Sequence, residues 1–272
     1  MTDRLERLLA LLDLEKIDRD LYRGTNPPAG GGRVFGGQVA SQALMAASNT
    51  VDVDHRVNSL HAYFLRPGRP GMPIIYTVDR IRDGSSFTTR RVVAVQDGEA
   101  IFNLDASFHK DEPGGEYQLP SPLAAVPDPE TLERESHRWA RAHRRPTDVR
   151  DVEPPSPLAT RAHWMKADGV LPDDPVVHAC VITYLSDSGP VGAARRPIRE
   201  SDGDGGWDRM MTASLDHCLW FHRPARADEW LFYELEAVAC TNARGLARGE
   251  IWARDGRLVA TVAQEALLRP RR

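Results

Sequence analysis

The feature that most constrains the fold of this chain is an internal repeat. Leu60–Pro67 is an aromatic and aliphatic stretch that ends in Arg-Pro, and Leu215–Pro224 ends in the same way. An apolar run follows each Arg-Pro, and an Asp-Gly pair follows each run, at Asp97 and Asp255. The offset between the copies is 157 residues at the Arg-Pro pairs (223 − 66) and 158 at the Asp-Gly pairs (255 − 97). Chance matches would drift, so this offset predicts two copies of one fold unit, a domain duplication.

The repeat and the length of 272 residues together predict a two-domain chain. Domains of about 100–150 residues are the most common size. We expect an N-terminal domain at residues 1–112, a linker at 113–158 and a C-terminal domain at 159–272. The linker is placed by a change in composition, because proline is frequent there and charged residues crowd together. Two like domains form an internal pseudo-dimer, and ligands often bind between domains.

Composition and charge narrow the possible partners and the compartment. The formal net charge of −4 gives no basic excess for a phosphate backbone, so we expect no nucleic-acid partner. No apolar run is long enough to span a membrane, and residues 1–7 mix both charges, unlike a signal peptide. Cys180, Cys218 and Cys240 are odd in number and widely spaced, without a disulfide framework or metal-site spacing. These observations predict a cytoplasmic protein.

The first copy is predicted to be one buried helix followed by antiparallel strands. An amphipathic helix opens the chain over residues 5–12. A second helix, over 38–47, is so rich in small residues that we expect it to lie close against a sheet. Strands at 86–96 and 100–108 flank Asp97-Gly98, a pair typical of a type I′ hairpin.

The second copy is predicted to repeat that order. Asp174 and Pro175 are typical of a helix cap and a first helical position, and Gly189-Pro190 should end or kink the helix that follows them. We expect a mobile loop at 195–207 and an exposed helix in the linker at 130–144. Four strands are expected at 211–219, 231–238, 245–254 and 258–268, with Asp255-Gly256 as the hairpin turn between the last two. Each copy is therefore predicted to be an α+β unit.

Several common catalytic and binding motifs are absent from the sequence. No serine lies in a Gly-x-Ser-x-Gly pattern, no Gly-x-Gly-x-x-Gly follows a predicted strand, and no phosphate-loop lysine motif occurs. The histidine and cysteine spacings of zinc sites are also missing. These absences exclude an α/β-hydrolase and argue against a nucleotide-binding protein or a zinc enzyme.

Six motifs spread along the chain carry a resemblance to a known family. They are Gly36-Gly37-Gln38-Val39, Tyr63-Phe64-Leu65-Arg66-Pro67-Gly68, Arg82-Asp83-Gly84-Ser85-Ser86-Phe87, Ser214-Leu215-Asp216-His217, Trp220-Phe221-His222-Arg223-Pro224 and Ala243-Arg244-Gly245. From Leu5 to Arg269 the chain resembles the type II acyl-CoA thioesterases, which are double-hotdog enzymes. The resemblance implies a tandem hotdog of α+β class, in which two antiparallel sheets each wrap around one long central helix.

The resemblance also implies an active site and a reaction. The family uses an Asp, a Ser or Thr, and a Gln from the second copy, and these positions fall on Asp187, Ser214 and Gln264. Asp187 would act as the base on a water held by Ser214 and Gln264, and backbone N–H groups or a helix N-terminus would meet the oxyanion. Acyl-CoA would be hydrolysed to free fatty acid and coenzyme A without a metal or an organic cofactor. The resemblance implies a homo-oligomer as well, a dimer or tetramer of double-hotdog chains.

Without the resemblance, the same side chains have ordinary structural interpretations. A carboxylate at a helix end, a strand serine and a buried amide most often only make hydrogen bonds. Asp216, His217 and His222 suggest a hydrolytic set with Ser214, but side chains on a strand alternate between its faces, so we expect no convergence. We interpret His217 and His222 as packing or interface groups. Cys218 is expected to pack as a small apolar residue and not to act as a nucleophile.

Two other functions are compatible with this fold. A hydratase or dehydratase acting on an acyl-CoA double bond would need a His or Glu paired with an Asp near the acyl β-carbon. No suitable His stands beside a predicted helical Asp in either copy. A non-catalytic acyl-CoA binding module would show a degraded set of site residues, whereas all three group types are present.

Overall fold

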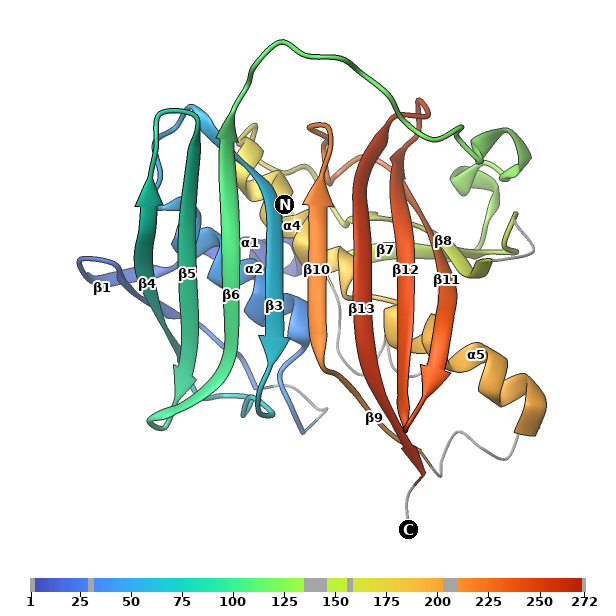
Figure 1. Cartoon of the computed structure of the whole chain (residues 1–272), viewed down its shortest axis with the longest axis horizontal. Coiled ribbons are helices and arrows are strands. Elements are labelled where there is room, and N and C mark those ends of the chain that lie inside the picture. The colour runs from blue at the N-terminus through green and yellow to red at the C-terminus, as the bar shows by residue number, and fades with distance from the viewer. Residues whose placement is uncertain (1–2, 29–31, 135–145, 156–158, 203–209, 271–272) are drawn as a thin grey trace.

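A single antiparallel sheet with helices on one of its faces forms the fold (Figure 1). The computed structural model describes residues 3–28, 32–134, 146–155, 159–202 and 210–270. The first half contains β1 (Glu15–Asp18), β2 (Leu21–Gly24), β3 (His55–Phe64), β4 (Ile74–Asp83), β5 (Phe87–Gln96) and β6 (Glu99–Lys110). The second half contains β7 (Thr147–Val152), β8 (Ala159–Ala167), β9 (Met210–Ser214), β10 (Asp216–Phe221), β11 (Leu231–Thr241), β12 (Arg244–Ala253) and β13 (Leu258–Pro270). The described helices are α1 (Asp3–Leu12), α2 (Gly36–Ser48), α4 (Pro175–Ser186) and α5 (Pro190–Asp202), with 3-10 turns at Leu123–Ala125 and Pro129–Thr131.

The strand order shows the internal duplication directly. The order is β1-β2-β4-β5-β6-β3-β10-β13-β12-β11-β8-β7, and β9 pairs with β13. Counted outward from the centre, β3, β6, β5, β4, β2 and β1 match β10, β13, β12, β11, β8 and β7. The two sheets that the resemblance implied join edge to edge, because β3 pairs antiparallel with β10. Helices α2 and α4 contact each other behind this junction (Figure 1). The tandem α+β fold is confirmed.

Helix α2 is buried because its side chains are small and mostly apolar. Its buried residues are Gly37, Val39, Ala40, Ser41, Gln42, Ala43, Leu44, Met45, Ala46 and Ala47. Short side chains let the helix backbone come close to the sheet, and burial removes their apolar surface from water. The predicted position of this helix against the sheet is therefore confirmed.

The two Asp-Gly turns differ in detail. Asp97 and Gly98 both have positive φ, at 52° and 75°, as a two-residue type I′ turn requires. In the second copy Gly256 has a φ of 89°, but Asp255 is not among the residues with positive φ. The connection there also runs over four residues, from Ala253 to Leu258. The first hairpin prediction is confirmed in its turn type, and the second in its position only.

Two segments differ from the expected secondary structure. Residues 195–202 were expected in a loop but belong to α5, which contains Pro197. This helix packs on β11, β12 and β13, and the contact buries Ala193 and Ala194. The polar composition of the segment gives no indication of this contact. The expected helix at 130–144 lies mostly outside the described residues, and its described part holds only the end of a 3-10 turn.

The region predicted as a linker covers one end of the sheet. Strand β7 lies within it and pairs with β8. The Nε1 atoms of Trp164 and Trp230 donate hydrogen bonds to Pro127 O at 3.0 Å and Glu130 Oε1 at 2.9 Å. Three linker side chains, Leu123, Val126 and Leu132, pack on a small cluster of buried residues that is separate from the main core. The cluster consists of Val152, Ala162, Trp164, Trp230, Phe232, Trp252 and Leu258. The domain boundaries remain a proposal.

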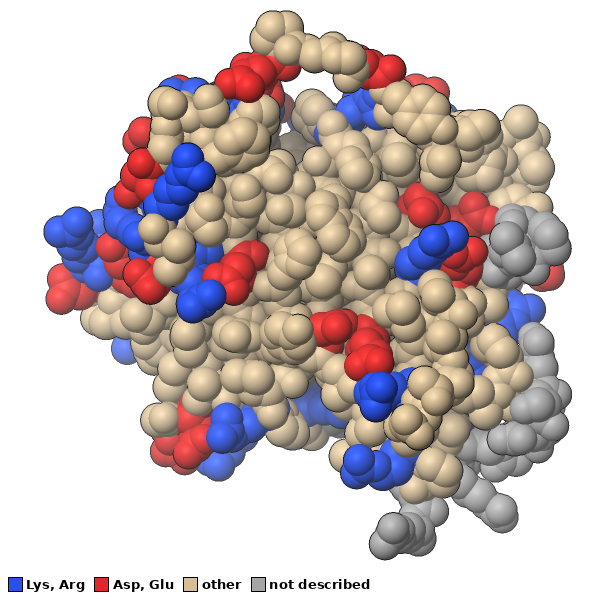
Figure 2. All heavy atoms as spheres, viewed as in Figure 1, with Lys and Arg blue, Asp and Glu red and all other residues tan. Residues whose placement is uncertain are grey.

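The outer face of the sheet is the face turned away from the helices. Its middle is not covered by the linker and carries few charged side chains (Figure 2).

Candidate active site

Asp187 stands between the end of α4 and the start of α2. Helix α4 begins as predicted, with the Asp174 carboxylate accepting from Val176 N at 2.8 Å, and ends at Ser186. The carboxylate of Asp187 follows immediately and is only 8% exposed. Its Oδ2 accepts a hydrogen bond from Gly37 N at 2.8 Å. A carboxylate of the second copy therefore caps a helix of the first copy.

The start of α2 favours negative charge. Its N-cap residue, Phe35, makes no side-chain hydrogen bond to the first turn, so the N–H groups there need acceptors from elsewhere. The N-terminal end of a helix also carries a partial positive charge of about one half. This environment stabilises Asp187 as a carboxylate, and backbone N–H groups of the same kind can stabilise a developing oxyanion.

Two glycines allow the close approach of α2 and α4. A Cβ atom at Gly37 would lie 2.5 Å from the carbonyl oxygen of Tyr184. A Cβ atom at Gly36 would lie 2.8 Å from Asp187 Oδ2 and 2.6 Å from a ring carbon of Phe64. Larger residues would therefore separate the two helices and push the carboxylate away from its donor.

We expect Gly37→Ala to lower the free energy of unfolding by about 1–3 kcal/mol, the usual cost of overpacking. The added methyl group would meet a backbone carbonyl, which cannot turn aside as a side chain can. Urea denaturation measures the change. Gly115→Ala is the matched control, because a Cβ atom there has nothing within 4 Å. Equal stability of the two variants would contradict the close packing of α2 on α4.

A break in the strand pattern brings Ser214 and His217 to the same side of the sheet. The expected strand 211–219 is two strands, β9 and β10, which are separated at Leu215. Their register against β13 shifts by one residue across this break. Such a bulge reverses the alternation of side chains beyond it. Both Ser214 and His217 consequently contact the side chain of Gln264.

The structure brings the three predicted site residues together. Gln264 in β13 is 1% exposed, and its Nε2 donates to Ser214 Oγ at 2.9 Å. Ser214 Oγ in turn donates to Asp187 Oδ1 at 3.4 Å, a long hydrogen bond. A carboxylate from the end of α4, a hydroxyl from β9 and an amide from β13 thus converge. This set can hold a water molecule and accept its proton.

The buried imidazole of His217 belongs to the same network. Its Nδ1 lies 2.6 Å from Gln264 Oε1, and its Nε2 lies 2.8 Å from Ser186 Oγ. Burial lowers the pKa of His217, so the ring is neutral at pH 7. The interpretation of His217 as a packing or interface group is therefore incomplete. It assumed an unbroken strand, and no residue type at Leu215 signals the bulge.

Tyr233 holds the end of α4 from the sheet side. Its buried hydroxyl donates to the carbonyl oxygen of Ser186 at 3.1 Å. Burial raises the pKa of Tyr233, so the hydroxyl keeps its proton as a donor. The residue before Asp187 is thus fixed through its backbone by Tyr233 and through its side chain by His217.

The other groups considered from the sequence lie outside this network. Asp216 Oδ1 accepts from Glu265 N at 2.6 Å, and His222 Nε2 lies 2.9 Å from Thr261 Oγ1. Asp216 and His222 therefore do not join Ser214 in a hydrolytic set, as expected. Burial raises the pKa of Cys218 to about 11, so this side chain is a thiol at pH 7 and a poor nucleophile.

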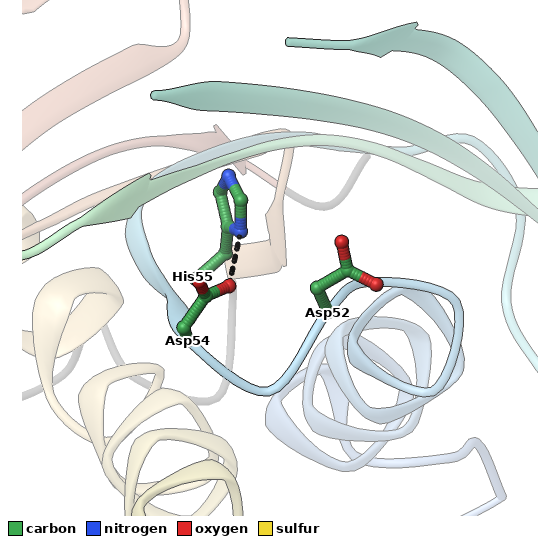
Figure 3. Close-up of side chains that lie close together, drawn as sticks. All are labelled: Asp52, Asp54 and His55. Atoms are coloured by element: carbon green, nitrogen blue, oxygen red, sulfur yellow. Dashed lines mark hydrogen bonds and ion pairs between the residues drawn. The ribbon is translucent and has the colours of Figure 1, made fainter. Parts of the chain in front are cut away.

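One group of potential metal ligands lies away from the site. The side chains of Asp52, Asp54 and His55 gather between the end of α2 and the start of β3 (Figure 3). Asp54 Oδ1 lies 2.9 Å from His55 Nδ1, and Lys110 Nζ lies 2.8 Å from Asp54 Oδ2. The lysine ammonium already supplies positive charge to this carboxylate. These contacts account for Asp54 and His55, and we propose no metal site there.

Comparison with known protein families decides the identity of the fold. Residues 25–109 match the family described as the acyl-CoA thioesterase N-terminal domain, and residues 118–268 match the acyl-CoA thioesterase C-terminal domain. The chain belongs to the acyl-CoA thioesterase family. It is a thioester hydrolase of type II with a tandem hotdog fold, in agreement with the resemblance seen in the sequence.

Individual acyl-CoA thioesterases are similar along nearly their whole length. Acyl-coenzyme A thioesterase 8 of Mus musculus is 38% identical over 96% of this chain and 88% of its own. Acyl-CoA thioesterase 2 of Haemophilus influenzae is 36% identical over 99% of both chains. The crystal structure of an acyl-CoA thioesterase II, TesB2, from Mycobacterium marinum has a TM-score of 0.85 and 38% identity, and covers 97% of each chain. The family assignment therefore applies to both halves and to their arrangement.

Proposed function

We propose that this thioesterase hydrolyses acyl-CoA to free fatty acid and coenzyme A with Asp187 as general base, and that Ser214 and Gln264 orient the attacking water. The observation that carries this proposal is the hydrogen-bonded set of these three side chains beside the start of α2. Asp187 is the member that can accept a proton, because a neutral hydroxyl and an amide are poor bases. Burial of Gln264 and Asp187 limits their contact with bulk water and keeps the set in one arrangement.

The reaction needs a water nucleophile, a base and a site for the oxyanion. The oxygen of water bonds to the acyl carbonyl carbon while one of its protons passes to Asp187. The carbonyl oxygen becomes an oxyanion, and we expect backbone N–H groups or a helix N-terminus to stabilise it. The C–S bond then breaks, and the proton on Asp187 goes to the departing thiolate. A thiolate leaves readily, so an activated serine nucleophile is not required.

We expect the wild-type protein to release coenzyme A and free acid in equal amounts from acyl-CoA substrates. A thiol-reactive dye follows release across a panel of acyl-CoAs from short to long chains, and mass spectrometry of the acid gives the balance. The profile would also indicate the preferred chain length. Folded protein that releases no thiol from any member of the panel would contradict the proposed function.

Among the residues that the structure describes, nothing favours the hydratase or the binding module. A hydratase would need a His or Glu that can reach the acyl chain, but the ring nitrogens of His217 already contact Gln264 and Ser186. A binding module would not need a connected carboxylate, hydroxyl and amide. Incubation with an enoyl-CoA separates the reactions, because hydration leaves the thioester intact whereas hydrolysis releases thiol.

The proposal also covers the oligomeric state of the protein and its location in the cell. No helix in the described part of the chain is long and apolar enough to cross a membrane. We propose that the chain forms a homo-oligomer of double-hotdog units, a dimer or tetramer. We also propose a cytoplasmic location, supported by three cysteines that are all free.

A further inference from the structure

We infer that His217 is a positioning residue, which holds the side-chain amide of Gln264 with its NH2 group toward Ser214 and so directs the Ser214 hydroxyl to Asp187. This inference rests on the proposed role of Asp187, Ser214 and Gln264. It adds two groups, the His217 ring and the Ser186 hydroxyl, that act on the site through Gln264. The orientation of these groups is set by which atoms can donate a hydrogen bond and which can only accept one.

The direction of the hydrogen bonds starts at Asp187. An ionised carboxylate can only accept, so the contact at 3.4 Å uses the single hydroxyl hydrogen of Ser214. The Ser214 oxygen then has only lone pairs left for Gln264, 2.9 Å away, and must accept from its NH2 group. The amide oxygen of Gln264 consequently points the other way, toward His217.

The amide oxygen of Gln264 in turn determines which nitrogen of the His217 ring carries the hydrogen. The amide oxygen of Gln264 only accepts, so Nδ1, at 2.6 Å, must carry a hydrogen. Ser186 Oγ lies 2.9 Å from the carbonyl oxygen of Thr183 and 2.8 Å from His217 Nε2, and its single hydrogen can go to only one of them. A neutral ring with its hydrogen on Nδ1 presents a lone pair at Nε2, which would face a lone pair of Ser186 Oγ unless the hydroxyl donates to the ring, so we assign the hydroxyl hydrogen of Ser186 to the bond with Nε2. The hydrogen bonds then form a series from Ser186 through His217, Gln264 and Ser214 to Asp187. In each of them the donor hydrogen points along the series toward the Asp187 carboxylate.

Burial favours the neutral ring that this arrangement needs. His217 is completely buried, and desolvation disfavours its charged form. Gln264 is almost equally buried, so little water competes for its amide. A buried amide with two fixed partners has one favoured orientation, because turning it over would place donor against donor or acceptor against acceptor.

The first copy shows that the fold itself does not need these polar groups. Cys218 pairs with Ala263 in the second copy as His61 pairs with Asp105 in the first. One residue earlier on β10 and one residue later on β13, the facing side chains in the second copy are His217 and Gln264. The matching pair in the first copy is Leu60 and Ala106, and both are buried. An apolar pair therefore packs well at this place, and the polar pair is explained by the site that only the second copy carries.

A direct test is the position of the ring hydrogen in the wild-type protein. We expect nitrogen-15 spectra of histidine side chains to show His217 as the neutral tautomer with its hydrogen on Nδ1. The signal is assigned through bonds from the His217 backbone amide. A hydrogen on Nε2 alone would require Gln264 to donate to Nδ1 and turn its oxygen to Ser214, and would overturn the inference. This measurement needs no variant and no substrate.

The kinetic test uses two substitutions of the same residue. His217→Leu copies the first-copy residue at this place, so we expect it to fold, and to lower kcat by about 10- to 100-fold because the amide is no longer held. His217→Asn retains an N–H donor near the position of Nδ1 and should recover much of that loss. KM should change little in either variant, because His217 is not expected to touch the substrate.

A matched histidine on the outer face provides the control. His222 is bonded to Thr261 and lies outside the network, so His222→Leu should keep wild-type kcat. Wild-type kcat in folded His217→Leu would overturn the inference while leaving the proposed hydrolysis intact. Equal losses in His217→Leu and His217→Asn would also overturn it, because a donor at Nδ1 would then not matter. Absence of hydrolysis by the wild type would instead contradict the proposed function, and the tautomer would still test the arrangement.

Discussion

Replacement of Asp187 by Asn is expected to lower kcat for acyl-CoA hydrolysis by about 10²- to 10⁴-fold, the usual contribution of a general base. The substitution keeps the shape of the side chain, and its amide oxygen can still accept from Gly37 N, which is 2.8 Å from the carboxylate. An amide cannot accept a proton from water, however. Thiol release at saturating acyl-CoA measures kcat, and circular dichroism checks the fold.

Asp216→Asn is the matched control for this experiment. Asp216 is also a partly buried carboxylate, and it accepts a backbone hydrogen bond from Glu265 N at 2.6 Å, which an Asn oxygen can accept as well. We expect this variant to keep wild-type kcat. Retained turnover in Asp187→Asn would remove Asp187 from the role of base. Equal losses in both variants would show that the effect comes from the fold.

Local sequence patterns predicted the elements of the fold but not how they join. The small residues of α2, the Asp174 cap of α4 and the Asp97-Gly98 turn each determine a local structure through their own chemistry. The pairing of β3 with β10 depends instead on the complementarity of two strands about 157 residues apart, which no local pattern records. Helix α5 was missed for a related reason, because its contact with β11, β12 and β13 outweighs its polar composition.

The candidate site was less accessible to reasoning from residues alone. Asp187, Ser214 and Gln264 were singled out by resemblance, since a carboxylate, a hydroxyl and an amide are common and their spacing implies no contact. The structure explains how they meet, through the approach of α2 to α4 and the bulge at Leu215. The bulge also explains why His217 was assigned to packing, because one inserted residue reverses the face to which a strand side chain points.

Gln264→Ala is expected to lower both activity and stability. We expect kcat to fall by about 10²-fold, because Ser214 loses its donor and the attacking water loses part of its support. We expect the free energy of unfolding to fall by about 1–3 kcal/mol, because the Nδ1–H group of His217 is left buried without an acceptor. Thiol release and urea denaturation measure the two effects separately.

Addition of His217→Leu to Gln264→Ala should restore stability without restoring activity. The double variant recreates the buried Leu60–Ala106 pair of the first copy, and removal of both hydrogen-bond partners is close to neutral when apolar groups replace them. A double variant no more stable than Gln264→Ala would show that His217 had not been left unpaired. A double variant with recovered turnover would show that Gln264 supports only the fold. Recovered stability with turnover still lost would mean that both copies share the packing at this place, and that the second copy alone uses it for chemistry.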